Sequence, residues 1–286
     1  MMNAPSSITG TPEDLAPASH AGAALVRALS ASLDALEKAA ADPDPVEMVH
    51  DARKAMKEYR ALLRLVPDAV ARVARRHSAE AARAMSHARD RATAHEALDL
   101  LDAMGLLLPC DLADARAAVG DDATPEEAER HRASLAAFLA EAREQIDGAL
   151  GAAAGMADVG EELEHSYRRA RSADFGTPEA MHEARKRVVA HRYQMSFIAT
   201  AFAGRGAKRA RKAQRLRDFF GAYQDLETLR PMLHGAQPAL AEGTLERLDH
   251  ALKRAQAHLR KKALRRHAAL FRRKPEDFRR HYRDIL

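Results

Sequence analysis

The chain has 286 residues, enough for one large domain or two smaller ones, and aromatic residues make up 5% of it, with no Trp. No run of eighteen apolar residues occurs, which excludes a helix that spans a membrane, and the single Cys110 excludes an internal disulfide. The net charge of +5 is unevenly placed. Residues 1–150 carry 17 Lys and Arg against 25 Asp and Glu, whereas residues 151–286 carry 29 against 16, so we expect an anionic partner.

The chain begins with residues 1–18, which hold several Pro and Gly and few large apolar groups, so we expect a disordered lead-in. This segment does not resemble a signal peptide, because no basic stretch precedes an apolar one. The lack of resemblance to a signal peptide and the single Cys110 together favour a cytoplasmic protein. Leucines at helical spacing then predict a helix over residues 20–41, and Asp42-Pro-Asp-Pro45 ends that helix and begins the next one.

Residues 49–66 form a helix in which cations occupy the spacing that an apolar seam normally has. The intervals are three, four, three and four residues, for His50, Arg53, Lys57, Arg60 and Arg64. At about 100° per residue these side chains fall within an arc of about 80°, while large apolar residues gather on the opposite side. The pattern predicts one face for a core and one face for an anion. A solvated basic face is the alternative interpretation.

The same pattern returns in residues 181–198, which indicates an internal duplication. The second copy contains His182, Arg185, Lys186 and Arg192. These residues follow by 132 positions the first-copy residues His50, Arg53, Lys54 and Arg60. In both copies an acid follows the histidine and a proline lies a few residues upstream, so we expect two similar helices with similar starts.

Each of these two helices is followed by another basic helix, which we interpret as a further wall of the same basic surface. After the first copy, Pro67 ends the helix and the next one carries Arg72, Arg76 and Arg83. After the second copy, Gly204 to Gly206 end the helix and the next one places on one face Lys208, Arg211, Lys212 and Arg215. For all of these residues a solvated surface is the alternative. The Gly-rich residues 151–160 predict a linker between a first half, residues 19–150, and a second half, residues 151–286.

These motifs resemble the CHAD family, which is named for a histidine-bearing α-helical domain. The family's helix reads His-x-x-Arg-x-x-x-Lys/Arg-x-x-Arg. The first copy matches it fully, and the second departs at Val189, where a basic residue is usual. Residues 220–226, Phe-Gly-Ala-Tyr-Gln-Asp-Leu, resemble a second family segment, and residues 85–90 match it less well. The resemblance implies an all-α fold of two pseudo-symmetric four-helix-bundle halves, with a basic groove between them that binds inorganic polyphosphate. It implies no catalytic role and no cofactor, and it suggests targeting or scaffolding at polyphosphate granules.

Two other functions remain as alternatives. Nucleic-acid binding fits the basic second half, but aromatic residues are not interleaved with the basic stripes and no nucleic-acid-binding signature appears. A metal-dependent phosphohydrolase fits the fourteen histidines, but no His-Glu-x-x-His motif occurs and an arginine follows each signature histidine by three residues. We therefore expect a polyphosphate-binding protein that is not an enzyme and holds no metal.

Overall fold

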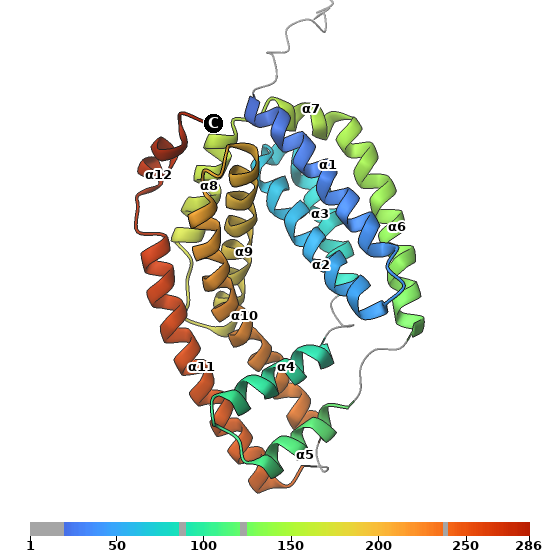
Figure 1. The fold of residues 1–286 in the computed structure, drawn as a ribbon, viewed down its shortest axis with the longest axis vertical. Coiled ribbons are helices and arrows are strands. Elements are labelled where there is room, and N and C mark those ends of the chain that lie inside the picture. The colour runs from blue at the N-terminus through green and yellow to red at the C-terminus, as the bar shows by residue number, and fades with distance from the viewer. Residues whose placement is uncertain (1–19, 86–89, 121–124, 237–239) are drawn as a thin grey trace, which may run out of the picture.

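The computed structural model describes residues 20–85, 90–120, 125–236 and 240–286, and all regular structure in these residues is helical (Figure 1). This confirms the all-α prediction, and none of the described helices is long and apolar enough to cross a membrane. The expected lead-in, residues 1–18, lies outside the described residues. The helices are α1 (His20–Ala40), α2 (Pro45–Leu62), the 3-10 helix η1 (Leu63–Leu65), α3 (Asp68–Ala84), α4 (Asp90–Ala103), α5 (Pro109–Val119), α6 (Pro125–Asp147), α7 (Ala149–Gly155), α8 (Val159–Arg171), α9 (Pro178–Ala201), α10 (Ala207–Gly235), α11 (Glu242–Leu270) and α12 (Pro275–Tyr282).

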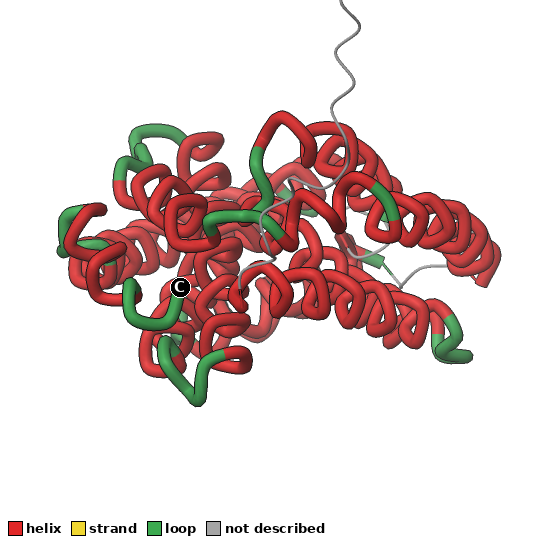
Figure 2. Tube along the Cα trace, turned by 90° about the horizontal axis from the view of Figure 1, so that it is seen from above, coloured by secondary structure: helices red, strands yellow, loops and turns green. Residues whose placement is uncertain are grey.

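The helices gather into two groups that lie beside each other in Figure 1. In one group α1 packs on α2, α6 and α7, and α3 packs on α6; in the other α9 and α11 pack on α10, and α8 packs on α9 and α12. Contacts between α2 and α9 join the groups. From above, the helices are joined by loops, many of them at the periphery (Figure 2). The helices that carry the duplicated motif, α2 and α9, therefore meet at the junction.

The starts of α2 and α9 follow from local sequence. Asp44 caps α2, and its side chain accepts a hydrogen bond from the backbone N–H of Val46 at 2.8 Å. Thr177 caps α9 by accepting from the backbone N–H of Ala180 at 3.2 Å. Each cap is followed by a proline at the first helical position, where the missing N–H costs no hydrogen bond. The two signature helices thus begin with the same chemistry.

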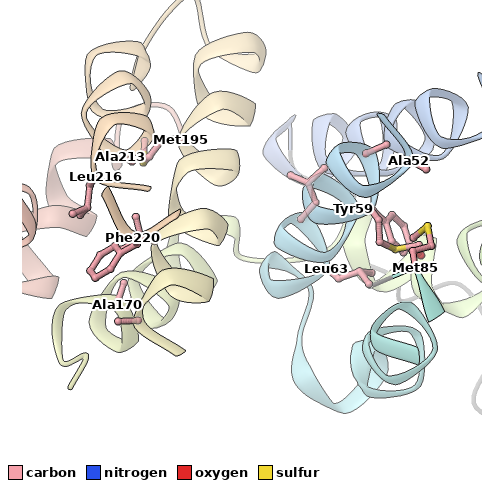
Figure 3. Packing of buried hydrophobic residues seen from close by; sticks show 14 of the residues in the cluster. Ala52, Tyr59, Leu63, Met85, Ala170, Met195, Ala213, Leu216 and Phe220 are labelled. Atoms are coloured by element: carbon pink, nitrogen blue, oxygen red, sulfur yellow. The ribbon is translucent and has the colours of Figure 1, made fainter. Parts of the chain in front are cut away.

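Buried apolar residues pack in both groups of helices, and many of them are alanines. Figure 3 shows Tyr59 among neighbours from the first group, and Phe220 with Leu216 in the second. Tyr59 and Phe220 are among the largest fully buried side chains. Alanine keeps the helices close together, and leucines and larger residues such as Tyr59 and Phe220 fill the space between them.

The segment expected to be a linker is largely helical. Helix α7 continues to Gly155, and only three residues separate it from α8. The close approach of α1 explains the small residues here: a Cβ at Gly22 would lie 2.0 Å from the carbonyl oxygen of Gly155. Glycine at position 22 is thus required by helix packing, whereas the sequence alone suggested that the Gly-rich residues 151–160 form a linker.

Helices α4 and α5, which belong to the predicted first half, pack on α10 and α11 of the second half, at the lower end of the molecule in Figure 1. A bidentate ion pair fixes this contact, because Arg247 donates through Nη2 and Nε to the buried Asp111 carboxylate at 2.6 and 2.9 Å. Hydrogen bonds from Arg247 lower the pKa of Asp111. Helices α4 and α5 of the predicted first half are therefore packed against the second half.

Candidate functional site

Helices α2 and α9 pack through small residues and are tied by buried hydrogen bonds. Ala61 of α2 lies against Ala190 and Tyr193 of α9. Gln194 is fully buried: its Nε2 donates to the Ala61 carbonyl at 3.1 Å, and its Oε1 accepts from Ser166 Oγ of α8 at 2.9 Å. Since a buried amide needs these partners, the hydrogen bonds fix how the two signature helices sit against each other.

A cavity of about 260 Å³ lies at this junction, between α2, η1, α3, α9 and α10; we call it the interhelical cavity. Its lining contains no acidic side chain among the described residues. Its cationic and titratable lining residues are Arg53, Lys57, Arg60, Arg64, Arg75, His182, Arg185, Lys186 and Arg217. The remaining lining residues are Ala61, Ser78, Val189 and Ala190. The structure therefore brings residues of both sequence copies to one cavity.

Several of these cations are held by backbone carbonyls. Arg53 donates through Nη1 to the Met85 carbonyl at 2.6 Å, which connects α2 to the end of α3. Arg75 donates through Nη2 to the carbonyls of Leu63 and Val66 at 2.9 and 2.7 Å. Arg75 thus satisfies carbonyls at the end of the α2–η1 segment, and Arg53 satisfies the carbonyl of the residue that follows α3, so both guanidinium groups are fixed on the cavity wall.

The histidine of the second copy is also held in place. His182 Nδ1 donates to Gln224 Oε1 at 3.0 Å, and Gln224 belongs to the 220–226 segment that resembles a family motif. Burial lowers the pKa of His182, and the nearby charges of Lys186 and Arg185 lower it further. The neutral ring therefore carries its proton on Nδ1, which leaves Nε2 to take up a proton when an anion is near.

The arginines of the first copy sit in an unfavourable environment for charge. Burial lowers the pKa of Arg60, and so does the neighbouring charge of Arg83. Burial also lowers the pKa of Arg64 to about 10, with Arg169, Arg75 and Arg60 contributing in the same direction. A bound anion would offset both the lost hydration and the repulsion between cations. Arg60 and Arg64 therefore favour an anion at this wall of the cavity, whereas Lys186, Arg75 and Arg217 already pair with Glu183, Asp68 and Asp218 outside the lining.

Several predicted residues lie outside this lining. His50 and Lys54 are exposed on α2, and Lys54 lies 3.8 Å from Asp51. Arg192 stacks on Tyr193, with its guanidinium carbon 4.2 Å from the ring centroid. On α3, the exposed residues Arg72, Arg76 and Arg83 are also outside the lining, although Arg83 is close enough to Arg60 to influence its pKa.

The predicted basic face of α10 is divided. All four residues are exposed; Lys208 and Lys212 also line a different cavity, between α10, α11 and α12, whereas Arg211 and Arg215 line neither cavity. The α10 residue that reaches the interhelical cavity is Arg217. At about 100° per residue, Arg217 lies on the opposite flank of the helix from Lys208, so a search for a single stripe missed it.

Arg75 and Ser78 of α3 were also missed. In the sequence, Arg75 is one of several arginines on the same helix, and nothing there sets it apart. In the structure it differs from them because it donates to the carbonyls of Leu63 and Val66. Val189 explains why the second copy departs from the motif: it packs against the Ala61, Ala190 and Tyr193 cluster at the α2–α9 contact. A cation at position 189 would lose hydration against this apolar contact.

No group of three or more His, Cys, Asp or Glu that could hold a metal ion occurs within the described residues.

The comparisons with known proteins concern the family and the fold. The family model of the CHAD domain matches residues 23–234, so the chain belongs to the CHAD family. A solved structure, "PptA from Streptomyces chartreusis", is similar with a TM-score of 0.61 over 90% of this chain and 100% of that chain. At 16% sequence identity this likeness concerns the fold, and the comparison with curated proteins found no match.

Proposed function

We propose that this CHAD protein binds inorganic polyphosphate in the interhelical cavity and acts by binding rather than by catalysis. The observation that carries the proposal is the lining of the cavity, in which eight Lys and Arg side chains and His182 from α2, η1, α3, α9 and α10 converge without an acid among the described lining residues. Membership of the CHAD family supports it, because polyphosphate binding is what the family resemblance implies. The expected role is scaffolding or targeting at cytoplasmic polyphosphate granules.

The chemistry of the cavity suits a phosphate chain. Arginine donates bidentate, charge-assisted hydrogen bonds to phosphate oxygens, and lysine adds a compact positive charge. A linear polyphosphate presents such oxygens on every unit and has no bases to stack. The described lining offers no Phe, Tyr or Trp side chain as a stacking platform, which favours polyphosphate over single-stranded nucleic acid.

The proposal is tested by measuring polyphosphate affinity as a function of salt, with RNA as competitor. We expect affinity to fall steeply and linearly on a log–log plot, since counterions are released from a polyanion on binding. RNA at equal phosphate concentration should not displace polyphosphate, and added Mg²⁺ should not release phosphate. Equal displacement by RNA would instead assign the cavity to nucleic acid, and release of phosphate would indicate a hydrolase.

A pH dependence follows from His182. Because burial and neighbouring cations lower its pKa in the free protein, a bound phosphate should raise that pKa, and binding should take up a proton. Affinity should therefore rise as pH falls from 8 through the ordinary histidine pKa of about 6.5, and level off below the pKa of the free protein. The slope is at most about tenfold per pH unit for one proton. Titration calorimetry between pH 8 and 5 measures it.

The His182→Gln variant should lose most of this slope, whereas His258→Gln, at an exposed position on α11, should retain it. If His182→Gln kept the full pH dependence, the imidazole would have no part in binding the anion.

A further inference from the structure

A second basic cavity of about 290 Å³ lies between the start of α10, the end of α11 and α12. No acidic residue belongs to its lining within the described part of the chain. The cationic and titratable side chains that line it are Lys208, Arg209, Lys212, Arg272, Arg273, His281 and Tyr282. The interhelical cavity shares none of these residues, so the function proposed above does not account for this second cavity.

Arg209 is the fixed element of the second cavity. Its Nε donates to His191 Nε2 at 2.7 Å, and its Nη2 donates to the Leu270 carbonyl at 2.7 Å. Its guanidinium carbon lies 4.9 Å from the ring centroids of both Tyr167 and Phe278, which stack on each other at 4.0 Å. A guanidinium held by rings and hydrogen bonds loses little freedom when an anion binds.

The surroundings of the second cavity are strongly positive. Burial lowers the pKa of Arg209, and burial followed by Arg273, Arg205 and Arg209 lowers the pKa of His281. Two acids on neighbouring segments have other partners: Asp277 of α12 pairs with Arg280, and Asp158 accepts from Arg279 at 2.8 Å. Cations gather here without a carboxylate in the lining, so an anion would relieve their repulsion.

We infer that the second cavity is a separate binding site for a short oligophosphate. Lys208 and Lys212 lie on the flank of α10 opposite to Arg217, so α10 itself separates this site from the interhelical cavity. The volume of about 290 Å³ exceeds what one small ion needs. The recognised chemistry is the phosphate oxyanion, which is supplied either by a free oligophosphate or by a segment of a longer polyphosphate.

The experiment is titration calorimetry of the full chain with tripolyphosphate. Wild type should bind two molecules. The Lys208→Gln/Lys212→Gln variant, which leaves the anchored Arg209 in place, should bind one, with the affinity of the lost site reduced at least about tenfold per lysine. The Lys253→Gln/Arg254→Gln variant removes the same charge from exposed positions about 22 Å along α11 from Ala269, and should still bind two.

The inference would be overturned if wild type and all variants alike bound two tripolyphosphate molecules. It would also be overturned if wild type bound one molecule and the Lys208→Gln/Lys212→Gln variant bound that molecule unchanged. A single molecule that only this variant loses would support the second site and contradict the function proposed for the interhelical cavity.

Long-chain polyphosphate distinguishes the two sources. If one chain spans both sites, its affinity should fall in this variant through lost avidity; if the site takes free oligophosphate, that affinity should stay unchanged.

Discussion

Replacing Arg60 and Arg64 together with glutamine should weaken polyphosphate binding about a hundredfold or more. Both side chains line the interhelical cavity, and each charge-assisted hydrogen bond to phosphate is worth about 1.5–3 kcal/mol, or roughly ten- to a hundredfold in affinity. The same double variant should fold at least as well as wild type. In the free wild-type protein, burial lowers the pKa of Arg60 and of Arg64 and so disfavours their charges. Removing the two charges therefore also removes this cost.

The measurements are titration calorimetry with polyphosphate and urea unfolding in its absence. Lys253→Gln/Arg254→Gln is the matched control, because it removes two positive charges from exposed positions outside both cavities. The control should bind within about threefold of wild type, since distant exposed charges are screened. An equal loss of affinity in the control would mean that net charge alone attracts the polymer. A double variant that unfolds would show that the two arginines are structural.

Replacing Gln194 with methionine should lower the free energy of unfolding by about 1–3 kcal/mol. The substitution nearly preserves the shape of the side chain but removes both of its hydrogen bonds. The buried Ser166 Oγ then loses its acceptor, whereas the Ala61 carbonyl still accepts from the backbone N–H of Leu63. Each buried polar group that loses its partner costs about 1–3 kcal/mol. Because Ala61 lies on the cavity wall, the same change should also weaken polyphosphate binding by loosening α2 against α9.

Urea denaturation followed by circular dichroism gives the stability, and calorimetry gives the affinity. Gln145→Met on α6 is the control: Gln145 bonds to Glu141 one turn away at the surface, so both quantities should stay close to wild type. Wild-type stability in Gln194→Met would mean that these buried hydrogen bonds do not fix the α2–α9 junction.

The sequence predicted the helical fold and the two signature helices well, because proline, capping residues and helical periodicity are local signals. Asp44, Pro45, Thr177 and Pro178 alone place the starts of α2 and α9. The packing of α4 and α5 was not predictable in this way. It depends on Asp111 meeting Arg247, which lies 136 residues later, and no local pattern carries that information.

Only part of the lining of the interhelical cavity was predicted, because local signals identify the stripe on one helix but not the side chains that tertiary packing brings to it. A stripe on one helix identifies Arg53, Lys57, Arg60 and Arg64, all of which line the cavity. Arg217 was missed, because its position depends on which flank of α10 faces α2 and α9. Conversely, Lys208 and Lys212 have the right chemistry and spacing but face another cavity. Periodicity describes the faces of a helix, and only tertiary packing decides what each face meets.

The most direct test of the central claim is a crystal structure of the chain with a short polyphosphate. The account predicts phosphate groups between α2 and α9, with oxygens within hydrogen-bond distance of Arg60 and Arg64 on one side and of His182 and Arg185 on the other. Phosphate density found only on exposed surfaces, with the space between α2 and α9 filled by water, would contradict it.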